Sequence, residues 1–127
     1  MHESVTGTWK LESFDIIGPK GETRPWGHNT AGLLLYTLNG HMSVSINRAI
    51  VPIGSNTPKD LFDSILFYAG TYSIEGNVIS HKVTNASNPS RIGKEMIRYA
   101  KLEDGLLELK SPVESFGQAI LVWRRVS

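Results

Sequence analysis

Residues 32–47 read GLLLYTLNGHMSVSIN, two short apolar segments separated by an Asn-Gly turn signal. An Asn-Gly pair between alternating residues is typical of a β-hairpin. In the second segment Met42, Val44 and Ile46 alternate with polar residues, and this period of two is typical of a half-buried strand. We therefore expect a hairpin that turns these three side chains to the protein interior.

The length of the hairpin loop decides where Tyr36 points. A three-residue loop, Leu38-Asn39-Gly40, places Tyr36 on the same face as Met42. A two-residue Asn39-Gly40 turn shifts the pairing by one residue and sends Tyr36 outward. The three-residue loop is the preferred interpretation.

Turn signals recur on both sides of this hairpin and divide the chain into short segments with strand character. The expected strands are Thr8–Ile17, Gly32–Thr37, His41–Asn47, Gly70–Ile74, Val78–Thr84, Glu95–Glu103, Leu106–Lys110 and Ala119–Val126. Eight strands joined by tight turns predict an all-β fold, an eight-stranded antiparallel up-and-down barrel. Eight strands also close around enough space for one small ligand. We expect residues 1–127 to form a single domain.

The segment Pro58–Phe67 differs from the rest because its apolar residues, at positions 61, 62, 65 and 66, have helical spacing. Thr57 is a suitable N-cap and Pro58 suits the first helical position. We expect a short helix between the third and fourth strands. It is either a surface connection, the simpler interpretation, or a lid over one barrel mouth, in which case Phe62 would contact the ligand.

Composition excludes several functional classes. The chain has no cysteine, which rules out disulfides, thiolate zinc sites and a cysteine nucleophile. Its formal net charge is +1, which gives no electrostatic reason to expect nucleic acid or an anionic membrane as a partner. No pair of histidines has metal-ligand spacing and no phosphate-binding loop occurs, so we expect neither a metal nor a cofactor. The N-terminus resembles no signal peptide, and we expect a cytoplasmic protein.

Lysines indicate which face of each strand is exposed, because burying an ammonium group in a small barrel is costly. We expect Lys10, Lys82, Lys101 and Lys110 to point outward. Their strand neighbours then point inward: Trp9, Leu11 and Ser13; Ile79, His81 and Val83; Met96, Arg98 and Ala100; Leu107 and Leu109.

Two members of this inward set, His81 and Arg98, are ionisable. A buried arginine needs a partner, and no carboxylate shares its face, so Arg98 is a candidate anchor for a carboxylate, phenolate or carbonyl oxygen. His81 is a candidate acid, base or hydrogen-bond donor. The alternative for both is structural, with His81 bonded to a neighbouring tyrosine. Like charge on Arg98 should keep His81 neutral near pH 7.

Several motifs of the sequence resemble those of a single protein family. Gly7-Thr8-Trp9 opens the first strand, and Arg124-Arg125 follows Trp123 on the last. Between them lie Pro25-Trp26-Gly27, the hairpin of residues 32–44, Tyr68-Ala69-Gly70-Thr71-Tyr72, Val78–Val83, Asn88-Pro89 and Gly93 to Arg98. From Gly7 to about Leu109 the chain resembles the small bacterial and fungal lipocalin-like domain family.

This resemblance implies a calycin-type barrel in which a basic residue of the last strand packs over Trp9. Some family members belong to natural-product pathways, and lipocalin-like barrels there include cofactor-free cyclases and isomerases. Tyr36, Met42, Tyr72, His81 and Arg98 match positions typical of the family. Outside these matches, Trp26 lies in a Pro/Gly-rich loop before the second strand, where it is either a residue of the barrel mouth or a side chain packed on the barrel rim.

The function expected from the sequence is binding of an apolar small molecule with a polar handle inside the barrel. The alternative is a cofactor-independent isomerase or cyclase, with pericyclic catalysis included, that acts on a polyketide- or terpenoid-like intermediate. In that case His81 would move a proton while Arg98 and a tyrosine stabilise negative charge. The sequence leaves a homodimer open. The candidate ligand-binding residues are Tyr36, Met42, Val44, Tyr72, His81, Arg98, Trp26 and Phe62.

Overall fold

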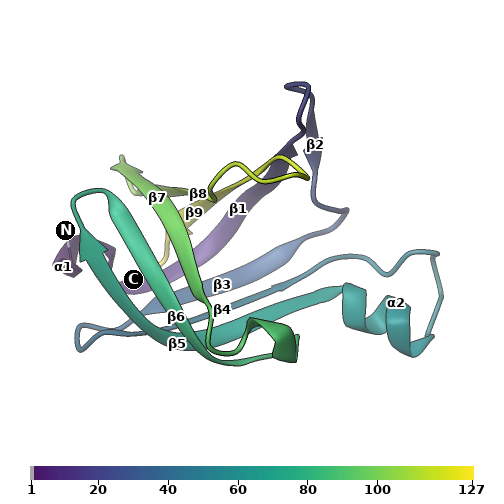
Figure 1. The fold of residues 1–127 in the computed structure, drawn as a ribbon, viewed down its shortest axis with the longest axis horizontal. Coiled ribbons are helices and arrows are strands. Elements are labelled where there is room, and N and C mark those ends of the chain that lie inside the picture. The colour runs from purple at the N-terminus through teal and green to yellow at the C-terminus, as the bar shows by residue number, and fades with distance from the viewer. Residues whose placement is uncertain (1) are drawn as a thin grey trace.

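The protein is a closed antiparallel β-barrel, as the sequence predicts (Figure 1). The computed structural model describes residues 2–127. Consecutive strands from β3 to β9 are neighbours, and β1 pairs with both β3 and β9, which closes the sheet. The strands are β1 (Gly7–Ile17), β2 (Thr23–Pro25), β3 (Ala31–Tyr36), β4 (His41–Asn47), β5 (Ile65–Glu75), β6 (Val78–Ala86), β7 (Glu95–Glu103), β8 (Leu106–Lys110) and β9 (Gln118–Arg125).

The hairpin of β3 and β4 has the three-residue loop. Tyr36 pairs with Met42 across the hairpin, and the Thr37 amide donates to the His41 carbonyl at 2.9 Å. This register turns Tyr36 and Met42 inward together, and both are buried. The preferred loop length is therefore confirmed.

The inward and outward faces predicted from the lysines are correct on β6, β7 and β8 but only on part of β1. Lys10, Lys82 and Lys101 are exposed, whereas Trp9, Ile79 and Val83 are buried. On β1 the register to β9 shifts between Leu11 and Ser13.

This β-bulge reverses the alternation of faces on β1. Phe14 and Ile16 are buried beyond it, so the predicted inward position of Ser13 is wrong. An extra residue in one strand moves every later side chain to the other face.

The far end of β1 also carries the short strand β2, which extends the sheet beyond the barrel. Pairing runs from Asp15 to Ile17 on β1 and from Thr23 to Pro25 on β2. In Figure 1 this pair rises above the barrel. It places the loop containing Trp26 beside Phe14, whose carbonyl accepts from the Trp26 amide at 2.9 Å.

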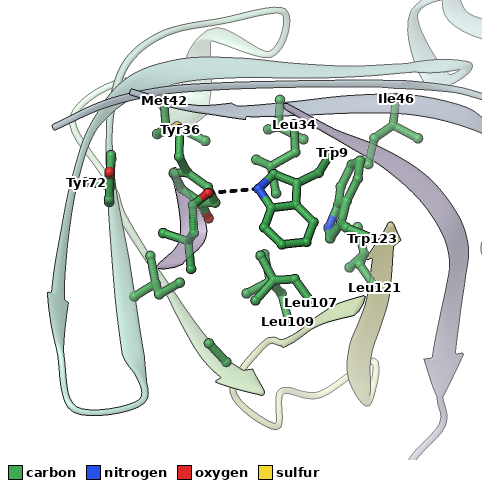
Figure 2. Packing of buried hydrophobic residues seen from close by; sticks show 14 of the residues in the cluster. Trp9, Leu34, Tyr36, Met42, Ile46, Tyr72, Leu107, Leu109, Leu121 and Trp123 are labelled. Carbon is green, nitrogen blue, oxygen red and sulfur yellow. Dashed lines mark hydrogen bonds between the residues drawn. The ribbon is translucent and has the colours of Figure 1, made fainter. Parts of the chain in front are cut away.

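The barrel base is sealed by Trp9, which is fully buried (Figure 2). Its Nε1 donates to the Val5 carbonyl at 2.8 Å, and the Arg125 guanidinium lies 4.2 Å from its ring centroid. Val5 belongs to α1 (His2–Val5), a single helical turn that the sequence analysis did not identify. The stacking of a last-strand basic residue on Trp9 confirms the closure that the family resemblance implies.

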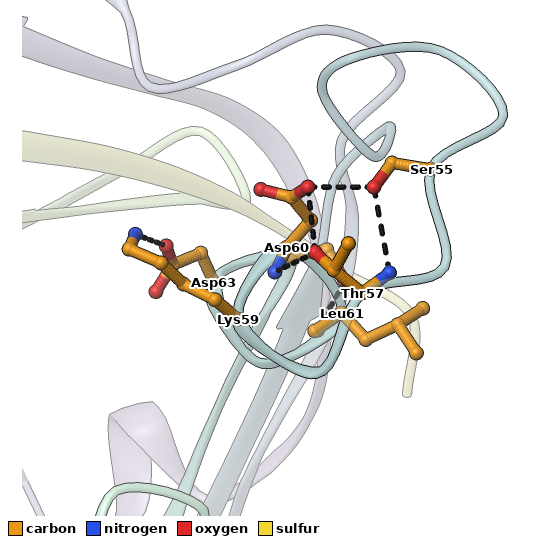
Figure 3. A network of polar contacts seen from close by, with 7 residues as sticks. Ser55, Thr57, Lys59, Asp60, Leu61 and Asp63 are labelled. Atoms are coloured by element: carbon orange, nitrogen blue, oxygen red, sulfur yellow. Dashed lines mark hydrogen bonds and ion pairs between the residues drawn. The ribbon is translucent and has the colours of Figure 1, made fainter.

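The predicted helix is present but shorter than expected. The helix α2 spans Pro58–Asp63, and the Thr57 hydroxyl caps it by accepting from the Asp60 amide. Figure 3 shows the polar contacts around this cap, in which Asp60 also accepts from the Ser55 hydroxyl at 2.6 Å. The helix buries none of its residues, and Phe62 is 48% exposed.

The residues after α2 correct the sequence prediction. Ile65, Leu66 and Phe67 belong to β5 and pair with β4. The apolar residues at positions 61, 62, 65 and 66 have helical spacing. Residues 65–67 nevertheless form a strand, because they pair with the edge of β4. The structure also contains η1 (Pro89–Arg91), a turn of 3-10 helix between β6 and β7. Within residues 2–127, no helix has the length and apolarity needed to span a bilayer.

Candidate functional site

The barrel encloses a cavity of about 590 Å³ above the sealed base. That volume lies within the usual range for small-molecule sites. Much of its wall is apolar and comes from strands on all sides of the barrel. The apolar wall includes Phe14, Ile16, Leu34, Val44, Ile46 and Leu121.

Aromatic and cationic groups stack at the part of the cavity next to β2. Trp26 lies parallel to Phe14, with ring centroids 4.8 Å apart and an interplanar angle of 4°. The Arg48 guanidinium covers the Trp26 ring at 4.2 Å, and its Nη1 donates to the Trp26 carbonyl at 2.6 Å. All three side chains line the cavity. Through one cation–π contact and one hydrogen bond, Arg48 holds the Trp26 loop against the barrel.

His81 lies at the centre of a buried polar cluster. It projects inward from β6 and is 2% exposed. Its Nε2 is hydrogen-bonded to the Tyr36 hydroxyl at 2.5 Å and its Nδ1 to the Tyr68 hydroxyl at 2.7 Å. Both ring nitrogens therefore have a protein partner, which is the structural role that the sequence analysis left open.

His81 is neutral across the physiological range. Burial, and to a smaller extent the positive charge of Arg98, together lower the pKa of its imidazole to about 3. The expectation of a neutral imidazole agrees with this shift, but desolvation is a larger cause than the like charge on Arg98. A neutral imidazole has one donor nitrogen and one acceptor nitrogen.

Arg98 projects from β7, the strand next to His81, and lines the same cavity. Its Nη1 donates to the Ile97 carbonyl at 2.8 Å. It also lies close to Tyr68: burial raises the pKa of the Tyr68 phenol, and the positive charge of Arg98 opposes that rise. A guanidinium has five N–H donors, so Arg98 retains donors for a further acceptor.

The charged side chains on the cavity are mostly cationic. They are Arg24, Arg48, Arg91, Arg98 and Glu114. Within residues 2–127, none of these four arginines forms an ion pair with a carboxylate. An apolar cavity bordered by unpaired guanidinium groups favours a ligand with negative charge or acceptor oxygens.

Of the residues proposed from the sequence, four line the cavity: Val44, Trp26, His81 and Arg98. The others lie outside its wall. Tyr36 and Met42 are buried but do not line it, and the Tyr36 hydroxyl contacts His81. The Tyr72 hydroxyl donates to the Thr37 carbonyl at 2.7 Å, and Phe62 lies exposed on α2.

Residues that the sequence analysis missed in the polar cluster and the cavity wall include Tyr68, Phe14 and Trp123. Tyr68 lies four residues before Tyr72 on β5, so strand alternation would have placed it inward had the strand been extended past Gly70. Phe14 was concealed by the bulge on β1. Trp123 also lines the cavity, although only its neighbour Arg124-Arg125 drew attention in the sequence.

The fold has counterparts among solved structures. A redesigned β-barrel matches at a TM-score of 0.51 with 10% sequence identity, covering 99% of this chain and 95% of the other. Fatty-acid-binding protein 1 of Echinococcus granulosus gives a TM-score of 0.49 with 15% identity, over 98% of this chain and 99% of that one. A mutant of the fluorescent protein UnaG gives 0.49 with 18% identity, over 100% and 99% of the two chains.

At these identities the likeness concerns the fold alone. No curated protein matches the sequence. The family model described as a lipocalin-like domain matches residues 6–126, nearly the whole chain. Together with the Gly7-Thr8-Trp9 opening and the Arg125 that covers Trp9, this match shows that the chain belongs to the lipocalin-like domain family.

Proposed function

We propose that this protein binds an apolar small molecule with an acidic or carbonyl handle inside its barrel. The observation that carries the proposal is Arg98, a guanidinium on an apolar cavity without a carboxylate partner among residues 2–127. Charge-assisted hydrogen bonds from arginine to a carboxylate are among the stronger polar contacts in proteins. A ligand oxygen would supply the partner that Arg98 lacks.

The apolar side chains of the cavity wall favour a ligand whose remaining part is apolar. Leu34 and Ile46 are buried side chains that present hydrocarbon to the cavity. Each square ångström of apolar ligand surface removed from water contributes roughly 25 cal/mol. The apolar wall thus provides affinity, and Arg98 sets the position of the handle.

Two measurements test this proposal. Native mass spectrometry of freshly purified protein should show a co-purified small molecule or an empty barrel that takes up dodecanoate. Calorimetric titration with dodecanoate should then show binding by the natural protein. Absence of dodecanoate binding up to its solubility limit would contradict the proposed function.

The role of Arg98 is tested by Arg98→Leu beside the matched control Lys101→Leu on the outward face of the same strand. We expect Arg98→Leu to weaken dodecanoate binding at least tenfold, about 1.4 kcal/mol. The Lys101→Leu protein should bind dodecanoate as the natural protein does. Both variants should have the melting temperature of the natural protein. Unchanged affinity in folded Arg98→Leu would refute the anchor.

A cofactor-independent isomerase or cyclase is the second candidate. Its supporting observation is the Tyr68 phenol, which contacts His81 at 2.7 Å and lies near the charge of Arg98. Donors held in this way can stabilise negative charge that develops on a substrate oxygen. If a ligand co-purifies, incubation with the protein followed by chromatography separates the two functions: a binder returns it unchanged, and an isomerase equilibrates it with a product of equal mass.

A further inference from the structure

We propose that Tyr36, His81 and Tyr68 form a hydrogen-bond relay with a fixed direction, which leaves the Tyr68 O–H free to donate into the cavity beside Arg98. The handle that binds there is then an acceptor oxygen, a carboxylate or a carbonyl, and a donor-only group such as an ammonium is rejected. This inference rests on the proposed function, because it concerns the ligand of the same cavity.

The three rings come from three separate strands. Tyr36 is on β3, Tyr68 on β5 and His81 on β6. The ring centroid of His81 lies 5.6 Å from that of Tyr36 and 5.7 Å from that of Tyr68. The imidazole therefore lies between the two phenols, with one hydrogen bond to each.

Burial of Tyr36 determines the direction of the relay. Tyr36 is 2% exposed and lies outside the cavity wall, and His81 is the hydrogen-bond partner of its hydroxyl among residues 2–127. If His81 Nε2 carried the proton, Tyr36 would accept it and its own O–H would have no acceptor. A buried donor without a partner is strongly disfavoured. Tyr36 therefore donates to Nε2, and burial, which raises the pKa of its phenol, keeps that proton in place.

The remaining proton positions follow from the chemistry of a neutral imidazole. Because Nε2 accepts, Nδ1 carries the ring proton and donates to the Tyr68 oxygen. Arg98 has donors only, so toward Arg98 the Tyr68 oxygen also accepts. The hydroxyl proton of Tyr68 is then left for the cavity, which Tyr68 lines together with Arg98.

Trp123 gives an independent indication of the same polarity. It is 1% exposed and lines the cavity, and its Nε1 is a buried side-chain donor without a hydrogen-bond partner within residues 2–127. Another cavity-lining hydroxyl, that of Ser111, is already used, donating to the Pro112 carbonyl at 3.0 Å and accepting from the Ala119 amide at 2.9 Å. At Trp123, Tyr68 and Arg98, the groups of the wall that still have an unpaired N–H or O–H are therefore donors, whereas the acceptor carboxylate on the wall, that of Glu114, belongs to an exposed residue.

The direction of the relay can be measured directly in the natural protein. Nitrogen-15 chemical shifts distinguish a protonated from a bare imidazole nitrogen, and the His81 signals are assigned through correlation with the backbone of residue 81. We expect a neutral ring with the proton on Nδ1 and a bare Nε2. A proton on Nε2 would overturn the relay, whatever the protein binds.

The selectivity is tested with two probes of equal chain length, dodecanoate and dodecylamine. Tyr68→Phe removes the donating hydroxyl, and we expect it to weaken dodecanoate binding about tenfold. Tyr36→Phe removes no atom from the cavity wall. Without the Tyr36 proton, Nε2 can take the ring proton and Nδ1 can accept from Tyr68, which draws the Tyr68 O–H away from the ligand. We expect Tyr36→Phe to weaken dodecanoate binding about twofold and to give the His81 ring a mixture of the two neutral tautomers, because Nε2 then has no partner in either form.

Tyr99→Phe is the matched control, since Tyr99 faces outward next to Arg98 on β7 and is 44% exposed. It should leave dodecanoate affinity and the His81 shifts unchanged. Dodecylamine should bind at least tenfold more weakly than dodecanoate to the natural protein. If Arg98→Leu loses dodecanoate while folded Tyr68→Phe and Tyr36→Phe retain it, the relay is refuted and the binding function stands. If the natural protein binds neither probe, the binding function itself is refuted.

Discussion

The Arg125 guanidinium lies 4.2 Å from the ring centroid of Trp9, and Arg125 also donates to the carbonyls of Ser4 and Thr6. Arg125, on the last strand, thereby covers Trp9 of the first strand and also binds the backbone of residues 4–6, which precede that strand. Figure 2 shows Leu107 and Leu109, both buried, below the Trp9 ring. The barrel base is therefore closed by a contact between the two ends of the chain.

Removing Trp9 should cost much of the stability. We expect Trp9→Ala to lower the free energy of unfolding by roughly 3–5 kcal/mol, the range for deleting a buried large aromatic side chain. Trp26→Ala is the comparison, because Trp26 is only half-buried and should cost less. Chemical denaturation measures both. A loss below about 1 kcal/mol for Trp9→Ala would show that the base does not depend on this ring.

Gly70 should not tolerate a side chain. It follows a register shift between β5 and β6, and a Cβ there would collide with the backbone carbonyl of Lys82. We expect Gly70→Ala to destabilise the protein by about 1–3 kcal/mol or more. Gly27→Ala is the control, since the three atoms nearest to a Cβ at Gly27 all belong to the flexible side chain of Arg48 and none to the backbone. Equal melting temperatures for the two variants would contradict the close approach at Gly70.

Acid should weaken the fold through His81. Its pKa is lowered from 6.5 to about 3 in the folded protein, so between these values the unfolded chain binds a proton that the folded chain does not. The contribution of His81 is complete above about pH 6.5 and declines as the pH falls toward 3, by about 1.4 kcal/mol per pH unit within that window.

Urea denaturation at pH 7 and pH 5 measures this slope. His81→Gln, which keeps an amide between the two phenols, should reduce the slope, and His41→Gln at an exposed position should not. An identical pH dependence in the natural protein and in His81→Gln would contradict a buried neutral imidazole.

Salt should weaken the binding of an anionic probe. The cationic groups around the cavity include Arg24, which is exposed, and Arg48 and Arg91, which are partly exposed, so mobile ions screen them. We expect dodecanoate affinity to fall as sodium chloride rises from about 0.01 to about 0.5 M, followed by calorimetry. Arg48→Leu should make that fall shallower, whereas Lys101→Leu should not change it. A salt-independent affinity would show that the arginines at the cavity edge do not attract the ligand.

The sequence predicted the elements whose signal is local. Alternation on β4 and the positions of Lys82 and Lys101 assigned the correct faces, because a period of two continues as long as a strand is regular. It predicted the wrong face for Ser13, since nothing in the residues 11–13 marks the bulge that β9 imposes on β1. It also missed Tyr68, because residues 65–68 have apolar spacing that fits a helix and a strand equally well. Pairing with β4 decides between them, and that is a long-range contact.

The bulge in β1 divides the strand into a part that closes the barrel base and a part that lines the cavity. Before it, Trp9 seals the base, and after it Phe14 and Ile16 line the cavity. Protein engineers can therefore vary Phe14 and Ile16 to reshape the chamber while the seal at Trp9 stays untouched. In a regular strand the face of Trp9 would fix the faces of Phe14 and Ile16, because side chains alternate strictly along the strand. The bulge that strand alternation did not predict therefore separates the side chains that close the base from those that shape the cavity.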